Sequence, residues 1–119
     1  MMAEVRTPDP RKFLRRLRRA LDKMKVSYYV EEDKNENVVY VSVPLDEDHL
    51  PRRIYVPYAS GGGRWLHLDD FEGTGSIDDY LQLLAERIAK RLGYGSVEEM
   101  PYFEPLDLTW YWKIPLSSD

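Results

Sequence analysis

One short segment, residues 11–25, restricts the fold of this chain more than any other. Its apolar side chains recur every three or four residues, so on a helix they form a single stripe about 120° wide. The stripe consists of Phe13, Leu14, Leu17, Ala20, Leu21 and Met24. Every arginine and lysine of the segment lies outside that stripe. The pattern predicts an amphipathic helix, capped by Thr7 or Asp9 with Pro8 or Pro10 in its first turn, that buries one side and presents a basic outer face.

After this helix the hydrophobic pattern changes to that of strands. Segments rich in β-branched and aromatic residues are separated by turn residues such as DKNEN and ASGGG. Pro57 favours the edge or the end of a strand. The expected strands are residues 26–32, 37–43, 53–58, 64–69 and 107–115.

A second helix is predicted from Ser76 onward. Ser76 is followed three residues later by Asp79, which is similar to a capping box, and Gly93 is well placed to end the helix. The buried stripe of this helix would consist of Ile77, Tyr80, Leu81, Leu84, Ala85, Ile88 and Leu92.

The order of these elements, α-β-β-β-β-α-β, predicts an α+β fold. Hairpin-length connections favour one antiparallel sheet of four or five strands, with the two main helices covering one of its faces. We expect a single globular domain over residues 1–119, with residues 1–8 and 116–119 as flexible tails.

Composition excludes several classes of protein. The absence of cysteine excludes disulfides, cysteine-ligated zinc and thiol catalysis. The sequence contains no apolar run of about 18 residues that would predict a membrane span, and its N-terminus lacks a hydrophobic secretory signal, so we expect a cytoplasmic protein. A charged fraction of 32% beside one Gln and two Asn is typical of thermophilic proteins, and would fit a small archaeal or viral protein.

Charge is divided unevenly along the chain, whose formal net charge is −4. Residues 1–25 carry nine arginines and lysines against three acids, and residues 26–119 carry eight against eighteen. Like charges stand four residues apart on the first predicted helix, and each such pair costs a few tenths of a kcal/mol. Burial of the apolar stripe returns roughly 1.5–3 kcal/mol for each large side chain, so the helix still forms. An anionic group is therefore expected to compensate the basic face.

Three kinds of anion could do so. The first is the chain's own carboxylates, such as Glu31, Glu32, Asp33 and Asp46–Asp48. The second is nucleic-acid phosphate, because arginine suits bidentate phosphate contacts and outnumbers lysine five to three in residues 11–25, although the acidic remainder is atypical of nucleic-acid-binding domains. The third is an acidic protein partner or an anionic membrane surface. The candidate nucleic-acid or anion site is Arg11, Lys12, Arg15, Arg16, Arg18, Arg19 and Lys23.

The last predicted strand offers a second candidate surface. Trp110 and Trp112 alternate with Tyr111, so both tryptophans share one face of that strand. They either pack in the core or form an aromatic platform for bases or for a partner. Nine tyrosines also exceed the need of one small core, so some are expected at the surface. The alternative function is therefore a protein-interaction domain that dimerises through its aromatic sheet face and C-terminal strand.

A run of three glycines followed by an arginine is the third feature. Gly61, Gly62 and Gly63 with Arg64 could form a mobile hairpin tip that contacts a partner, or a small anion-binding nest of backbone N–H groups.

An enzymatic function has the least support. His67 and Asp69 would share one face of a strand, and with Asp70 and Glu72 they could bind Mg²⁺, Mn²⁺ or Zn²⁺ for phosphodiester hydrolysis. This spacing is generic, and His49 is the only other histidine. We therefore expect a non-enzymatic binding or regulatory domain without a cofactor, a resident metal or catalytic residues.

Overall fold

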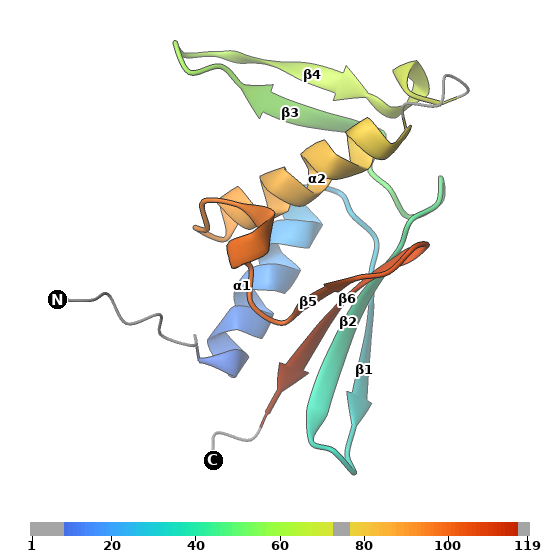
Figure 1. The fold of residues 1–119 in the computed structure, drawn as a ribbon, viewed down its shortest axis with the longest axis vertical. Coiled ribbons are helices and arrows are strands. Elements are labelled where there is room, and N and C mark those ends of the chain that lie inside the picture. Colours follow the sequence, from blue (N-terminus) through green and yellow to red (C-terminus); the bar gives the residue numbers. More distant parts are fainter. Residues whose placement is uncertain (1–8, 73–76, 117–119) are drawn as a thin grey trace, which may run out of the picture.

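The computed structural model describes residues 9–72 and 77–116, which form an α+β fold (Figure 1). The two main helices are α1 (Pro10–Lys23) and α2 (Ile77–Arg91), and two short 3₁₀ helices are η1 (Leu68–Asp70) and η2 (Val97–Glu99). The strands are β1 (Tyr29–Asp33), β2 (Val38–Pro44), β3 (Arg53–Pro57), β4 (Gly63–His67), β5 (Phe103–Pro105) and β6 (Thr109–Pro115). The predicted α+β class is confirmed, and the predicted order of elements matches except for one additional strand, β5, after α2.

Four strands form an antiparallel sheet in the order β1-β2-β6-β5. Along β2 and β6, buried residues alternate with partly exposed ones, so one face of the sheet is apolar. On this face Val41 lies opposite Trp112, and Trp112 lies opposite Phe103. The apolar stripe of α1 packs in the same buried cluster, because Phe13 and Leu17 are at most 1% exposed. Both helices lie on one side of this sheet, as the sequence predicts (Figure 1).

The start of α1 follows the predicted pattern. The side chain of Asp9 accepts a hydrogen bond from the backbone N–H of Arg11 at 3.0 Å, and Pro10 is the first helical residue. Asp9 is therefore the N-cap, and Thr7 and Pro8 lie outside the described residues.

The third and fourth predicted strands do not join the main sheet. β3 and β4 form a separate two-stranded hairpin, which lies across α2 from the four-stranded sheet (Figure 1). Instead of β3, the distant strand β6 pairs with β2, and the short strand β5 pairs with the other edge of β6. The single predicted sheet is therefore wrong, and β5 was not predicted, since a strand of three residues that ends in a proline carries too weak a local pattern.

The end of α2 is also as predicted. Gly93 has a φ of +97°, and the N–H of Tyr94 donates to the carbonyl of Ala89 at 2.9 Å, which is the bonding pattern of a glycine-terminated helix. Ser76, the predicted cap of this helix, lies outside the described residues.

The first residue of the expected C-terminal tail, Leu116, packs against the core. Leu116 is half-buried, and its N–H donates to the carbonyl of Asn37 at 2.9 Å. The rest of both expected tails lies outside the described residues. In the part of the chain that the structure describes, no helix is long and apolar enough to cross a bilayer.

Candidate functional site

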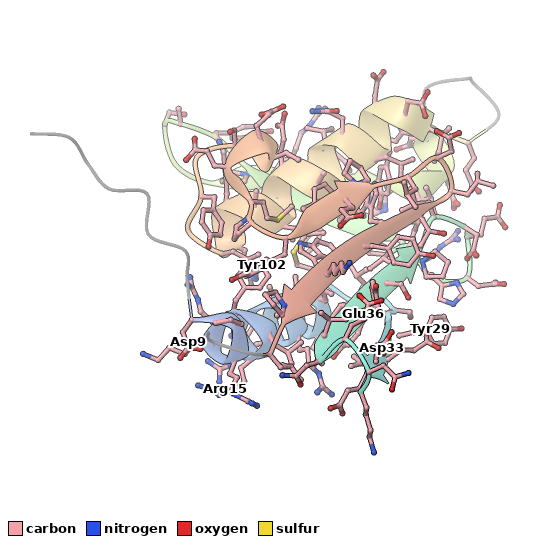
Figure 2. The ribbon with its side chains drawn as sticks, turned by 60° about the horizontal axis from the view of Figure 1, so that its bottom comes forward. Asp9, Arg15, Tyr29, Asp33, Glu36 and Tyr102 are labelled. Atoms are coloured by element: carbon pink, nitrogen blue, oxygen red, sulfur yellow. The ribbon has the colours of Figure 1, made fainter. Side chains whose placement is uncertain are left out.

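The basic face of α1 is exposed along its whole length. Its seven side chains are all solvent-accessible: Arg11, Lys12, Arg15, Arg16, Arg18, Arg19 and Lys23. Figure 2 shows Arg15 directed away from the body of the molecule, whereas the acidic residues Asp33 and Glu36 lie on the β1–β2 hairpin. The helix therefore presents its positive charge to solvent.

No carboxylate of the described residues forms an ion pair with this face. Three ion pairs join residues of the described ranges, His49–Asp46, Arg52–Asp69 and Lys113–Glu36, and none of them includes a residue of α1. Asp33 instead accepts hydrogen bonds from the N–H groups of Asn35 and Glu36 within its own turn.

Two arginines of the basic face have contacts within the fold. The guanidinium of Arg16 donates to the carbonyl of Leu92, just past the end of α2, where a positive charge is favourable. The Nε of Arg18 donates to the Tyr28 hydroxyl at 3.5 Å, and this contact raises the pKa of Arg18. Arg16 thus has a structural role that sequence analysis did not distinguish.

A second basic feature lies beyond the C-terminal end of α1. A cavity of about 420 Å³, here called the cationic pocket, opens between the end of α1, strand β3 and the second half of α2. Six basic side chains and no acidic side chain are found among its described lining residues. The basic residues are Lys23, Lys25, Arg52, Arg53, Arg87 and Arg91.

The remaining lining of the cationic pocket is apolar and aromatic. Met24 is partly exposed there, Ile54 and Leu84 are buried aliphatic residues, and Tyr55 and Trp65 contribute rings. Trp65 is 47% exposed, which is unusual for the largest apolar side chain. The pocket thus combines high positive charge with an accessible aromatic plane.

The rings at the pocket are held by contacts across the β3–β4 hairpin. Tyr55 and Trp65 are directly opposite in the register, with ring centroids 5.3 Å apart. The guanidinium of Arg53 lies 3.9 Å from the centre of the Trp65 ring, in a cation–π contact. These contacts fix the orientation of the indole.

A groove connects the cationic pocket to the basic face. This adjoining cavity of about 310 Å³ is lined by Arg16, Arg19, Ala20, Lys23, Arg91 and Leu92. It shares Lys23 and Arg91 with the cationic pocket, so the two cavities are neighbours. The C-terminal half of the basic face, the groove and the pocket therefore form one continuous basic surface.

Tyr80 of α2 fixes the position of the segment that contains Arg52 and Arg53. It is fully buried, and its hydroxyl donates to the carbonyl of Pro51 at 2.8 Å, directly before Arg52 and Arg53. Burial raises the pKa of Tyr80 to about 12. Ile54 and Leu68, both buried, attach the two ends of the hairpin to the same core.

The arginines of the pocket were missed by sequence analysis because they come from separate segments. One available signal was the pair Arg87 and Arg91, a like-charge pair four residues apart on α2. Another signal was Trp65. On its predicted strand Trp65 and Leu66 point to opposite faces, so one of the two had to lie outside the core.

The glycine run has a structural explanation in the hairpin tip. Gly61 and Gly62 have φ values of +107° and +71°, which the turn requires. A Cβ on Gly63 would lie 2.6 Å from both the Tyr55 ring and the Val56 carbonyl, so this glycine lets Tyr55 lie against the backbone. Neither these glycines nor Arg64 line the cationic pocket.

The C-terminal tryptophans lie in the core. Trp110 is 6% exposed and Trp112 is fully buried, so the predicted interface of Trp110, Tyr111 and Trp112 is wrong for both tryptophans. They face the helices because they alternate with Tyr111, which is partly exposed on the other face of β6. The expected surface tyrosines are instead Tyr29, Tyr55 and Tyr58.

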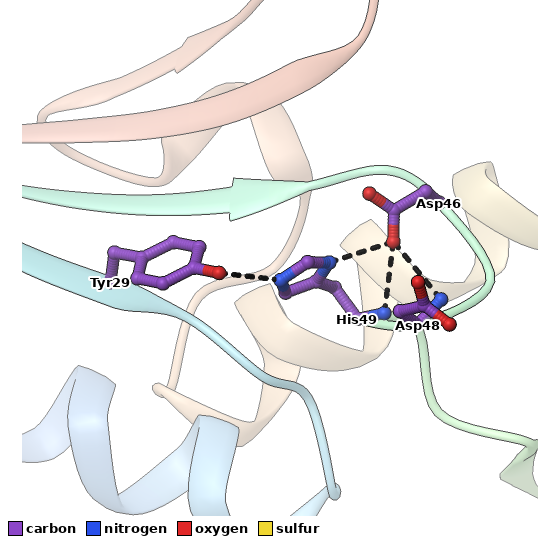
Figure 3. A network of polar contacts seen from close by, with 4 residues as sticks. All are labelled: Tyr29, Asp46, Asp48 and His49. Atoms are coloured by element: carbon purple, nitrogen blue, oxygen red, sulfur yellow. Dashed lines mark hydrogen bonds and ion pairs between the residues drawn. The ribbon is translucent and has the colours of Figure 1, made fainter.

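His49 belongs to a polar network between β1 and the loop that follows β2 (Figure 3). Its Nδ1 is 2.7 Å from Asp46 Oδ1, and its Nε2 is 3.0 Å from the Tyr29 hydroxyl. Asp46 also accepts from the N–H groups of Asp48 and His49, and the His49 contact lowers the pKa of Asp46. This network ties β1 to the loop after β2, and its residues line neither the cationic pocket nor the groove.

The predicted strand geometry of His67 and Asp69 is wrong. β4 ends at His67, because the buried Leu68 begins the 3₁₀ helix η1, so the alternation of strand faces does not extend to Asp69. Asp69 forms the ion pair with Arg52. Among residues 9–72 and 77–116, no group of three or more histidine or acidic side chains is arranged to hold a metal ion.

Comparison with protein-family models, with curated proteins and with solved structures finds no match for this chain. The site must therefore be interpreted from its own chemistry.

Proposed function

We propose that this protein is a non-enzymatic domain that binds nucleic acid through the basic face of α1. The observation that carries the proposal is that no carboxylate of the described chain pairs with this face. Exposed arginines four residues apart repel one another on a helix, and phosphates along a nucleic-acid backbone would remove that repulsion.

The extension of the basic face into the groove adds support. Arg19 and Lys23 of α1 are followed there by Arg91 of α2, so the positive surface continues past the end of the helix. A linear polyanion fits an elongated basic surface better than a single small anion does. The net charge of −4 is no obstacle, because the negative charge is concentrated elsewhere, as on Glu31 and Glu32 of β1.

Charge reversal tests this proposal directly. Fluorescence anisotropy would measure binding of labelled oligonucleotides to the wild-type protein and to the double variant Arg15→Glu, Arg19→Glu. We expect the variant to bind at least about tenfold more weakly at low salt, and the slope of log K against log salt to become smaller by about 1.5, because two phosphate contacts are lost.

A matched control carries the same change in net charge. Lys34 and Lys113 lie in the β1–β2 turn and on β6, outside the basic face, and the variant Lys34→Glu, Lys113→Glu should keep most of the wild-type affinity. Equal loss in both variants would mean that only total charge matters. That result, or a wild-type protein that binds no nucleic acid at about 50 mM salt, would overturn the proposal.

A further inference from the structure

We infer that the cationic pocket binds a base and its flanking phosphates from a single-stranded nucleic acid, with Trp65 as the stacking side chain. This inference rests on the proposed function and specifies the form of nucleic acid. Bases of a duplex are stacked inside the helix, and only an unpaired base can enter a pocket and lie on an aromatic ring.

The chemistry of the pocket matches both parts of a nucleotide. Trp65 is 47% exposed although the Arg53 guanidinium lies 3.9 Å from its ring centre, so part of the indole remains open to a base, and the half-buried Met24 adds apolar surface beside it. Arg52 is paired with Asp69 and Arg53 lies on Trp65, but Arg87 and Arg91 form no ion pair with the described residues. Their guanidinium groups can bind phosphate oxygens in pairs. A volume of about 420 Å³ lies within the usual range for ligand pockets.

The unpaired edge of β3 also borders the pocket. The consecutive residues Pro51 to Tyr55 all line it, and β3 is paired with β4 alone. Successive strand residues point to opposite faces, so a cavity that contacts all of them lies along the strand's edge. Such an edge presents backbone donors and acceptors that can bond to the edge of a base.

The adjoining groove favours a nucleic-acid strand over a free nucleotide as the ligand of the cationic pocket. The groove shares Lys23 and Arg91 with the pocket and continues to Arg16 and Arg19. A free nucleotide would leave these charges unused, whereas neighbouring phosphates of the same strand would meet them in sequence. An acidic peptide would supply the charge but not the flat ring system that the indole fits.

The natural fluorescence of the protein gives a direct test. Trp110 and Trp112 are buried, so quenching by an added strand would report on Trp65. Oligo-dT of about 20 nucleotides is a suitable probe, because it forms no duplex with itself and spans more than one site. We expect oligo-dT to quench the fluorescence, and free thymidine monophosphate to bind at least about a hundredfold more weakly.

Two substitutions at Trp65 separate stacking from charge. Trp65→Ala should weaken binding of oligo-dT by about tenfold and change binding of a duplex of equal length by less than about twofold. Trp65→Phe should keep affinity within about threefold while it loses the quenching signal. Tyr58→Ala is the control, since Tyr58 is 51% exposed on the same hairpin and does not line the pocket, and it should bind as the wild type does.

The outcomes distinguish this inference from the proposed function. If Trp65→Ala binds oligo-dT like the wild type while Arg15→Glu, Arg19→Glu still loses affinity, the pocket is not the base site and the proposed function stands. If poly-glutamate binds as tightly as oligo-dT and depends equally on Trp65, the pocket recognises an acidic chain. Absence of any binding by the wild-type protein would overturn both. Circular dichroism would confirm that each variant is folded, as the exposure of Trp65 leads us to expect.

Discussion

Tyr80 shows how one buried residue links the core to the candidate site. Its ring packs 5.2 Å from that of Phe71, and its hydroxyl holds the carbonyl of Pro51, so the arginines that follow leave the core at a fixed point. Sequence periodicity predicted that Tyr80 is buried. It could not predict the partner of its hydroxyl, because Pro51 lies in a loop that only the folded chain brings to α2.

Tyr80→Phe should therefore change the dependence of stability on pH. The folded-state pKa of Tyr80 is raised from 10.0 to about 12. The neutral side chain therefore stabilises the folded protein below pH 10, and this stabilisation is lost as pH rises toward 12. The variant should be less stable by about 1 kcal/mol near neutral pH, because the hydrogen bond to Pro51 is lost.

Between pH 10 and about 12, ionisation of Tyr80 should lower the free energy of unfolding of the wild-type protein by about 1.4 kcal/mol for each pH unit. The variant should lack this decrease. Urea unfolding at a series of pH values would measure both curves. Tyr94 and Tyr102, whose pKa values burial also raises, contribute equally to both proteins. Parallel curves would show that Tyr80 is not responsible.

Helix α1 could be predicted almost completely because all of its signals are local. The apolar stripe, the Asp9 cap and Pro10 fix its position and its buried side. The contact of Arg16 with Leu92 was not predictable, since nothing near Arg16 in the sequence indicates that the end of α2 lies beside it. The sequence thus predicted that the basic face lies at the surface, but it did not predict that Arg16 contacts the end of α2.

The basic face should also reduce the stability of α1. Arg15 makes no hydrogen bond or ion pair with the described residues, and Arg11 and Arg19 stand four residues to either side of it. Arg15→Glu replaces two repulsive pairs with two attractive ones, and should raise the free energy of unfolding by about 0.5–1 kcal/mol at low salt.

The same substitution should weaken nucleic-acid binding, so stability and affinity would change in opposite directions. Chemical unfolding at about 20 mM and 500 mM salt would measure the gain, which should fall by more than half at the higher concentration because these charges are exposed. Arg15→Gln should give about half the gain. If Arg15→Glu is no more stable than the wild type at low salt, repulsion between the charges of the basic face does not destabilise α1.

At the scale of the whole molecule, the arrangement of strands was the least predictable feature. β3 follows β2 along the chain, yet β6 takes the place beside β2, and β3 and β4 form their own sheet. Strand patterns show which residues are buried but not which strand pairs with which. The cationic pocket depends on this arrangement, because α1, β3 and α2 meet only when the hairpin lies across α2.

The separate hairpin should open more readily than the main sheet. β2 is paired on both sides and carries the fully buried Val41 and Val43. In contrast, β3 and β4 are paired only with each other and are attached to the core mainly through Ile54 and, directly after β4, Leu68. Hydrogen exchange followed by mass spectrometry should therefore show that residues 53–67 exchange at least about tenfold faster than residues 38–44, because the hairpin opens without loss of the four-stranded sheet.

Binding should then protect the hairpin selectively. If a strand of nucleic acid lies between Trp65 and the basic face, it bridges the hairpin to α1 and α2, and opening would require its release. Saturating oligo-dT should slow exchange in residues 53–67 and at the C-terminal end of α1, and leave β1 and its turn to β2 unchanged. Uniform slowing of all segments would indicate general stabilisation, and protection confined to α1 would mean that the ligand lies on the basic face without reaching the hairpin.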